Sequence, residues 1–273
     1  MAEAAASRGR LKDRVAVITG AATGIGRAFA SVFAEEGADV AIVDINEAEA
    51  EVTRDLVTSH GRQALIEICD VSKPEPVDAM VRSVMKKFGR VDVLVNGAIL
   101  RQGAPIEELT LEAWDTLMNI GLRGYFIVGQ RVSHEMIKRR SGVLINIAST
   151  GGYHPYPEAG AYSPCKAAVI MLAKLWGMEL GKYGIRACSI SPGYVRTPMT
   201  DHLYAQPDVL AGRSQSVPIG RIADSEEIAR AGAFLASDDA SYITAADLLV
   251  DGGFAHSKFL GVPGRHKPLG AAH

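Results

Sequence analysis

The stretch that decides the fold is Val15-Ala16-Val17-Ile18-Thr19-Gly20-Ala21-Ala22-Thr23-Gly24-Ile25-Gly26. A short, β-branched run leads into three glycines that open a helical pattern, which predicts a strand, a tight turn and a helix. Glycines at this point let the backbone approach a pyrophosphate, whose charge is favoured at a helix N-terminus. The spacing is Gly-x3-Gly-x-Gly rather than the Gly-x-Gly-x2-Gly of most dinucleotide folds. We therefore expect a phosphate-binding turn with contacts from Gly20, Thr23, Gly24, Ile25 and Gly26.

Strand and helix patterns alternate along the rest of the chain. Further apolar runs, near-continuous as in parallel strands covered on both faces, lie at 40–43, 91–95 and 143–147, with weaker candidates at 64–68, 185–190 and 247–250. Helical patterns occupy 24–36, 47–59, 74–88, 111–139, 161–182 and 225–236. Thr110 and Ser225 are expected to be N-caps. The alternation predicts a single-domain α/β fold, a doubly wound parallel sheet flanked by helices.

The composition excludes several classes of protein. The chain has 273 residues, 48% hydrophobic and 22% charged, with a net charge of -2, which is typical of one globular domain. Its mixed charges give no footprint for nucleic acid, and the basic run 138–140 is expected to end a helix. No apolar stretch approaches the roughly 20 residues that span a membrane. Cys69, Cys165 and Cys188 follow no disulfide or zinc pattern, so we expect a reduced, cytoplasmic protein without a metal site.

Three segments depart from the alternation. Residues 194–220 form a long insertion rich in Pro, Thr and polar residues, and we expect a functional or mobile loop there. Residues 1–10 lack the apolar core of a secretory signal and are expected to be a flexible N-terminus. Residues 257–273 show no helical or strand period and are expected to be a C-terminal tail. The folded domain is therefore expected to run from 11 to 256.

Asp44 closes the second predicted strand, about 20 residues beyond the glycine turn. A carboxylate there can accept hydrogen bonds from the adenosine ribose hydroxyls and would repel the 2′-phosphate of NADP. Thr23 and Ile45, which could supply a compensating cation, are uncharged. Arg27, directly after the glycine turn, is close enough in sequence to keep NADP open as an alternative. The pattern favours NAD as the cofactor.

Tyr162 and Lys166 lie four residues apart at the start of a predicted helix, and so on one face of it. A phenol is a poor base near neutrality because its pKa is about 10, but a nearby ammonium favours the phenolate and lowers that pKa. Tyr162 could then accept a hydroxyl proton while hydride leaves carbon, or donate it in reduction. Ser149 follows the fifth predicted strand, where its hydroxyl could hold a substrate oxygen. A Tyr-x3-Lys pair by itself is common on helix surfaces.

Taken together with 191–197 (Ser-Pro-Gly-Tyr-Val-Arg-Thr), these motifs resemble the short-chain dehydrogenase/reductase family over residues 11–254. The resemblance implies a Rossmann-type fold of about seven parallel strands. It implies Tyr162 as general acid/base, Ser149 as the hydroxyl that polarises the substrate, and Lys166 as the group that binds the nicotinamide ribose and lowers the pKa of Tyr162. It also implies further cofactor contacts at Asp70, Val71, Asn96, Pro192, Gly193, Val195 and Thr197. Relatives are usually homotetramers, so the tail 257–273 could alternatively cover a neighbouring subunit's active site.

Two departures from the family pattern stand out. The family normally has Asn-Asn-Ala-Gly after the fourth strand, whereas this chain has Asn96-Gly97-Ala98-Ile99. The seventh residue after Trp114 is usually a catalytic asparagine, and here it is Gly121. Asn119 is two positions away, roughly 200° around a helix, and cannot easily replace it. The family's proton relay is thought to use the backbone carbonyl at that position, which glycine keeps, so we expect activity to survive with a changed proton path.

Residues outside the motifs are expected to shape the substrate pocket. By their position we nominate Arg101, Gln102, His154, Tyr156, Tyr194 and His202. Their hydrogen-bonding groups suit a polyhydroxylated or anionic secondary alcohol, such as a sugar or polyol, better than a steroid. The expected activity is hydride transfer between NAD and such an alcohol or its ketone. The alternatives are an NADPH-dependent ketoacyl-type reductase, a non-catalytic dinucleotide-binding protein, and an epimerase or dehydratase on the same fold.

Overall fold

A seven-stranded parallel sheet runs through the residues, 9–100 and 103–257, that the computed structural model describes. Its strand order is β3-β2-β1-β4-β5-β6-β9, every neighbouring pair being parallel. The strands are β1 (Val15–Thr19), β2 (Asp39–Asp44), β3 (Ala64–Ile68), β4 (Val93–Asn96), β5 (Gly142–Ile147), β6 (Ile185–Pro192) and β9 (Asp247–Val250). This confirms the predicted α/β fold with a doubly wound parallel sheet of seven strands.

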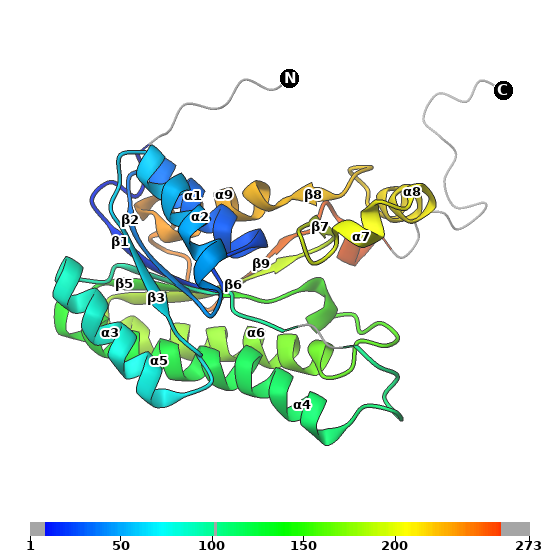
Figure 1. The fold of residues 1–273 in the computed structure, drawn as a ribbon, viewed down its shortest axis with the longest axis horizontal. Coiled ribbons are helices and arrows are strands. Elements are labelled where there is room, and N and C mark those ends of the chain that lie inside the picture. The colour runs from blue at the N-terminus through cyan, green and yellow to red at the C-terminus, as the bar shows by residue number, and fades with distance from the viewer. Residues whose placement is uncertain (1–8, 101–102, 258–273) are drawn as a thin grey trace.

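Helices cover both faces of the sheet (Figure 1). One face carries α1 (Gly24–Glu35), α2 (Glu47–Ser59) and α9 (Ser225–Ala236). The other carries α3 (Pro74–Phe88), α4 (Leu111–Met118), α5 (Gly124–Arg139) and α6 (Tyr162–Leu180). Strands β1, β4 and β5 are buried along their whole length between these layers. This explains why their sequences are continuously apolar instead of alternating.

The order in which successive strands are added to the sheet reverses at β1, which pairs with β2 on one side and with β4 on the other. Crossovers that leave in opposite directions open a crevice beyond the carboxyl ends of the strands, and α/β proteins bind ligands there. Thr19, Asp44, Asn96 and Ile147 are the last residues of β1, β2, β4 and β5. The fold therefore brings the ends of all four motif-bearing strands to one edge.

Residues 194–220, where the sequence predicts a functional or mobile loop, contain regular elements. They form β7 (Val195–Arg196), α7 (Asp201–Tyr204) and α8 (Pro207–Ser216), and β7 pairs with β8 (Ala223–Asp224). Arg213 of α8 lies over the rings of Tyr194 and Tyr204, 4.9 Å and 5.4 Å from their centroids. These contacts join residues nine and nineteen positions apart within the segment, and its composition alone does not reveal them.

Two helix predictions need correction. The predicted helix 111–139 is interrupted by a π-helical segment, Asn119–Arg123, between α4 and α5. Helix α9 is capped by Asp224 rather than Ser225, in a capping box with Glu227. Thr110 does cap α4, accepting a hydrogen bond from the Ala113 backbone N–H.

The two ends of the chain are described only in part. Arg10, expected in a flexible segment, donates hydrogen bonds from its backbone N–H and its guanidinium to the Glu36 carboxylate. The expectations for residues 1–8 and for the tail beyond Ser257 fall outside the described residues. None of the helices in the described ranges is long and apolar enough to cross a membrane.

Candidate active site

The glycine turn between β1 and α1 lies at the carboxyl end of β1, where the strand order reverses. A Cβ on Gly26 would come 2.0 Å from the carbonyl oxygen of Gly20, so the first turn of α1 can fold back onto the strand end only with glycine here. Thr23 is the N-cap of α1, but its side chain makes no capping bond, and the first turn of the helix carries no acidic residue. No acidic side chain of α1 itself therefore competes for the helix N-terminus, which suits a pyrophosphate.

Asp44 closes β2 directly beside this turn. Its carboxylate accepts hydrogen bonds from the backbone N–H of Ala22 at 2.9 Å, and from those of Ile45 and Asn46 at 2.8 Å and 3.1 Å. A carboxylate has about four acceptor sites, so it can still accept a ribose hydroxyl. Asp44 thus lies beside the glycine turn, and its contact with an adenosine ribose stays a prediction.

Ser149 and Tyr162 converge on one point, Gly151. A Cβ at Gly151 would lie 3.3 Å from Ser149 Oγ, 3.5 Å from Tyr162 Cε1 and 3.2 Å from Tyr156 Cε1. Ser149 is half-buried just beyond β5, and its Oγ is held by the Gly151 backbone N–H at 3.0 Å. Tyr162 begins α6. Ser149, Tyr156 and Tyr162 are separated in the sequence, and in the fold all three lie close to Gly151.

Lys166 lies deeper in the protein than Tyr162 and is 1% exposed. Its ammonium donates a hydrogen bond to the Ile147 carbonyl at 2.7 Å and lies 5.7 Å from the centroid of the Tyr162 ring. Burial lowers the pKa of Lys166 from 10.5 to about 8. The predicted pairing of phenol and ammonium on one helix face is thus present in the fold.

The remaining cofactor candidates fall into two groups. Pro192 and Gly193 lie at the end of β6, where the Gly193 N–H bonds the Val250 carbonyl. Val195 is buried in β7, and Thr197 packs on the glycine turn, 3.5 Å from where a Cβ of Gly24 would lie. This group therefore lies around the end of β6, with Thr197 beside the glycine turn.

In the second group the side chains mostly face inward. Asn96 is fully buried, and its Nδ2 donates to Asn146 Oδ1 at 3.1 Å. Val71 is buried near Gly124, where a Cβ would come 2.9 Å from Val71 Cγ2. Asp70 accepts hydrogen bonds from Ser72 and pairs with Lys73, and these bonds hold the pKa of Asp70 below its usual value. Asn96 and Val71 thus offer the crevice their backbone more readily than their side chains.

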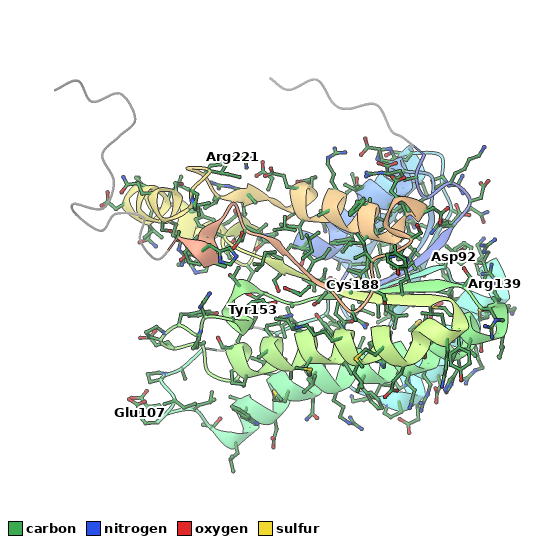
Figure 2. All side chains as sticks on the ribbon, turned by 180° about the vertical axis from the view of Figure 1, so that it is seen from behind. Asp92, Glu107, Arg139, Tyr153, Cys188 and Arg221 are labelled. Carbon is green, nitrogen blue, oxygen red and sulfur yellow. The ribbon has the colours of Figure 1, made fainter. Side chains whose placement is uncertain are left out.

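The substrate candidates are only partly brought together. Tyr156 lies beside Tyr162, with ring centroids 6.4 Å apart, whereas His154 is exposed and packs on Tyr153. Tyr194 contacts Phe254 and Arg213, and His202 is exposed on α7. Arg101 and Gln102 lie outside the described residues. Figure 2 labels Tyr153, which hydrogen-bonds Asp247 at 2.9 Å and marks the segment between Ser149 and Tyr162.

The two departures from the family pattern meet in space. Gly121 is buried in the π segment, where a Cβ would come 2.4 Å from Ile99 Cδ1 and 2.8 Å from Cys165 Sγ. Ile99 thus fills the volume that a side chain at position 121 would need. Neither contact could be read from sequence, although the unusual residues at both positions were visible there. π-Helical turns are frequent at functional sites, and here glycine accompanies the distortion.

Gly121→Asn should therefore lower stability and turnover together. Overpacking a buried site costs about 1–3 kcal/mol, and the asparagine must displace Ile99. Thermal unfolding and the rate of the hydride transfer expected from the sequence measure the two effects. Gly212→Asn is the control, because a Cβ there meets nothing within 4 Å on helix α8. A large gain in turnover for Gly121→Asn would instead show that glycine is a defect at this position.

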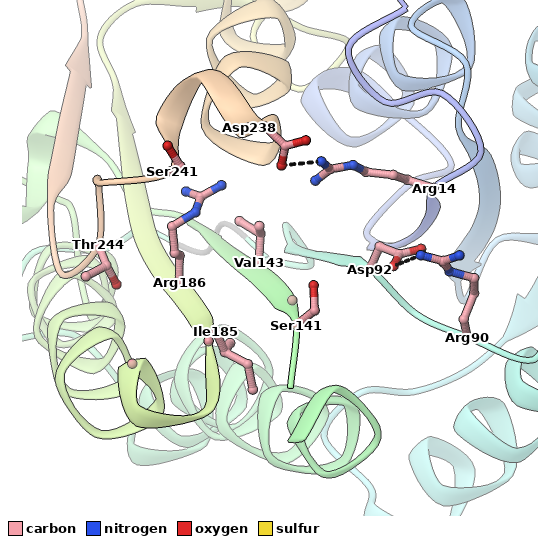
Figure 3. Close-up of a pocket in the computed structure, with 13 residues that line it drawn as sticks. Arg14, Arg90, Asp92, Ser141, Val143, Ile185, Arg186, Asp238, Ser241 and Thr244 are labelled. Carbon is pink, nitrogen blue, oxygen red and sulfur yellow. Dashed lines mark hydrogen bonds and ion pairs between the residues drawn. The ribbon is translucent and has the colours of Figure 1, made fainter. Parts of the chain in front are cut away.

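A separate cavity of about 460 Å³ lies at the opposite edge of the sheet (Figure 3). Its charged groups are already paired: Arg14 with Asp238 at 2.6 Å, and Arg90 with Asp92 at 2.6 Å. Arg186 donates to the backbone carbonyls of Leu235 and Ser237. The predicted site residues do not line this cavity, and we read its charges as a structural network. In the described part of the chain no cluster of three or more His, Cys, Asp or Glu could hold a metal ion.

Comparisons with known proteins agree with this geometry. A family model described as enoyl-(acyl carrier protein) reductase matches residues 20–255. The 3-oxoacyl-(acyl-carrier-protein) reductase of Thermotoga maritima is 36% identical over 247 residues, covering 89% of this chain and 98% of that protein. D-Threitol dehydrogenase of Mycolicibacterium smegmatis is 39% identical over 248 residues, covering 90% of this chain and 94% of that protein.

A crystal structure of NAD⁺-bound xylitol dehydrogenase is 32% identical, with a TM-score of 0.85, and the match covers 89% of this chain and 100% of that one. Fold, motif geometry and sequence identity thus point the same way. The chain belongs to the short-chain dehydrogenase/reductase family, whose members are oxidoreductases that bind a nicotinamide dinucleotide.

Proposed function

We propose that this protein is an NAD-dependent oxidoreductase that transfers hydride between nicotinamide and a secondary alcohol or its ketone. The observation that carries the proposal is the convergence of Ser149 Oγ and the Tyr162 ring on Gly151, with the buried ammonium of Lys166 behind the ring. This arrangement supports the proposal, because proton transfer coupled to hydride transfer requires a hydrogen-bond donor, a proton acceptor and a stabilising cation close together.

The residues have separate roles in the proposed mechanism. Ser149 holds the substrate oxygen through its hydroxyl. Tyr162, as phenolate, accepts the alcohol proton as the carbon loses hydride, and returns that proton to the oxygen in reduction. Lys166 stabilises the phenolate and binds the nicotinamide ribose. The bound nicotinamide supplies the hydride acceptor or donor. The glycine turn with Thr23 and Ile25, the carboxylate of Asp44, and the strand-end positions Asp70, Val71, Asn96, Pro192, Gly193, Val195 and Thr197 would hold the dinucleotide.

NAD is favoured over NADP because Arg27, the cation that follows the glycine turn, already binds other groups of the protein. Arg27 pairs with the Glu49 carboxylate, and its guanidinium also donates to Thr53 Oγ1 and to the Ala22 carbonyl. It would have to leave these partners to reach a 2′-phosphate, and that phosphate would also meet the Asp44 carboxylate. The solved xylitol dehydrogenase holds NAD⁺. The relative from Thermotoga maritima is named a ketoacyl-type reductase, which keeps that activity with NADPH as the second candidate.

Asp44→Ala should weaken NAD⁺ binding by about 10- to 100-fold, because hydrogen bonds to a charged acceptor are worth about 1.5–3 kcal/mol each. The same change should improve NADP⁺ binding, since it removes the repelling charge. Isothermal titration with each dinucleotide measures both effects. Asp39→Ala is the control, because Asp39 begins the same strand and its carboxylate bonds Gln63 N and Arg62. Unchanged preference in Asp44→Ala would assign cofactor selection to other residues.

The substrate we propose is a polyol, a sugar or an anionic hydroxy compound. The hydroxyls of Ser149 and Tyr162, with Tyr156 beside them, suit a molecule rich in hydrogen-bonding groups. One relative is named D-threitol dehydrogenase and a similar structure is a xylitol dehydrogenase. A panel of polyols, aldoses, hydroxy acids, sterols and ketones, assayed with NAD(H) and NADP(H), tests this. Turnover of steroids alone would refute the substrate class, and activity with NADPH and ketoacyl thioesters alone would establish the second candidate.

We also propose that the protein assembles as a homotetramer. Helix α6 exposes Met171, Leu175 and Met178, which lie on one face and are 64%, 48% and 76% exposed. An exposed apolar patch of this kind marks an association surface. Mass photometry of the full chain and of Met178→Glu tests the proposal, which predicts a tetramer that the variant weakens.

A further inference from the structure

The ammonium of Lys166 is held from two directions in the protein interior. From β5, the Ile147 carbonyl accepts one hydrogen bond at 2.7 Å. From α5, the Tyr125 hydroxyl lies 3.4 Å from Lys166 Nζ, and the Tyr125 ring centroid is 5.3 Å away. A buried cation is costly unless polar or aromatic groups surround it. Tyr125 therefore supplies both a hydrogen-bond acceptor and a π face to an ammonium that is 1% exposed.

Tyr125 is itself 1% exposed, and its hydroxyl lies 3.4 Å from the same Ile147 carbonyl. A carbonyl can only accept, so the phenol donates its hydrogen to Ile147 and presents a lone pair to Lys166. Burial, and then the neighbouring Cys165 and Tyr162, raise the pKa of Tyr125 well above 10. Tyr125 thus stays neutral under ordinary conditions and acts on Lys166 as a polar neighbour without a charge.

The π-helical segment Asn119–Arg123 directly precedes Tyr125. The Gly124 N–H bonds the Asn119 carbonyl, which is the extra-wide turn of a π helix. One additional residue in a turn rotates the residues that follow by about 100° relative to an uninterrupted α-helix. The local distortion thus helps to set the direction in which the Tyr125 side chain leaves α5.

We propose that Tyr125 is a positioning residue for Lys166, whose hydroxyl and ring keep the ammonium charged and fixed behind Tyr162. The proposal rests on the proposed function, in which that ammonium acidifies the Tyr162 phenol. Besides Tyr125 and Tyr162, Cys165 next to Lys166 on α6 is a titratable neighbour of this cation, and its charged form would raise the pKa of Lys166.

Loss of the Tyr125 hydroxyl should change how Tyr162 and Lys166 share a proton. When the Tyr162–Lys166 pair loses its first proton, it can be phenolate with ammonium or phenol with neutral amine, and only the first form is an effective base. Without the Tyr125 lone pair the ammonium is less stable, and the pair shifts toward the second form. The Tyr162 phenolate should then be scarcer at the same pH.

Ultraviolet phenolate absorbance of the full-length chain, titrated between about pH 6 and pH 10, tests the proposal without a substrate. We expect wild type to show one phenolate that forms below the ordinary range and that is absent in Tyr162→Phe. In Tyr125→Phe the amplitude of this early phase should fall about fivefold, since hydrogen bonds to charged groups are strong. Tyr183→Phe is the matched control, because its ring also lies beside a lysine, 5.1 Å from Lys182 Nζ, beyond the far end of α6.

The outcomes separate the two proposals. An early phase in Tyr125→Phe equal to that of wild type, with the phase absent in Tyr162→Phe, overturns the role of Tyr125 and leaves the proposed function standing. An early phase that is missing from wild type, or that persists in Tyr162→Phe, overturns both. Tyr125→Phe keeps the buried ring, and a thermal unfolding curve close to that of wild type will show that the variant is folded.

Discussion

Tyr162→Phe should lower the turnover number for alcohol oxidation about a thousandfold. Proton transfer by a positioned side chain contributes about 10²–10⁴ in rate, and Tyr162 is the group placed to perform it. Phenylalanine keeps the ring that packs near Tyr156 and removes only the hydroxyl. Initial rates of NADH formation with the fastest alcohol of the panel measure the effect.

The binding of NADH should be nearly unchanged in this variant, because its loss is one of proton transfer. Ser149→Ala is the companion variant, and it should lose less activity because it removes a polarising hydrogen bond instead of the base. If Tyr162→Phe kept wild-type turnover, the assignment of the base would be wrong.

Lys166→Met should abolish most activity and yet stabilise the fold. The pKa of Lys166 falls from 10.5 to about 8 in the folded protein, which corresponds to a cost of about 3 kcal/mol for keeping the buried ammonium charged. Methionine removes that cost, and the lost bond to the Ile147 carbonyl offsets part of the gain. We expect the free energy of unfolding to rise by about 2 kcal/mol at neutral pH, and turnover to fall about 100-fold.

The pH dependence of this gain has a definite sign. Because the folded-state pKa is lowered, the cost is fully present below about pH 8 and disappears as the pH rises toward 10.5. Wild type should therefore gain stability over that window, and the advantage of Lys166→Met should shrink. Urea unfolding at a series of pH values measures this. Lys174→Met, on the same helix, is the control and should change neither property. An unfolding free energy of Lys166→Met below that of wild type would contradict a costly buried ammonium.

The bounds of two helices could be predicted from the sequence, because residues at the helix ends determine them. Helices α2 and α3 begin and end at the predicted residues. Asn46 caps α2 through a bond to the Glu49 N–H, while Pro74 begins α3 and Gly89 ends it in the left-handed region. Such signals lie within a few residues of the element they bound, so they can be read from the sequence.

Features that depend on contacts between distant residues were missed. Helices α7 and α8 occur with contacts of the Arg213 guanidinium to the rings of Tyr194 and Tyr204, which the composition of the segment does not reveal. The complementarity of Ile99 and Gly121 required the fold to bring two chain segments together. Tyr125 is visible in the sequence only as an aromatic residue four positions after Gly121, and the π segment between them removes the simple α-helical spacing that would relate the two side chains. Its contact with Lys166 could be recognised only in three dimensions.

The sequence predicted where the site residues lie in the fold, while their roles stay predictions. Ser149, Tyr162, Lys166, Asp44 and the glycine turn all lie at the predicted edge, because parallel strands deliver their carboxyl ends to one side of the sheet. The side chains of Asn96 and Val71 face the interior, which the family motif does not distinguish from a contact made through the backbone.

A crystal structure of the full chain with NAD⁺ tests most directly whether one crevice assembles cofactor, base and cation. We expect the pyrophosphate at the N-terminus of α1, the adenosine ribose on Asp44, and the nicotinamide ribose within hydrogen-bond reach of Lys166, with the ring beside Tyr162. A nicotinamide bound beyond the reach of both Tyr162 and Lys166 would contradict the proposed chemistry.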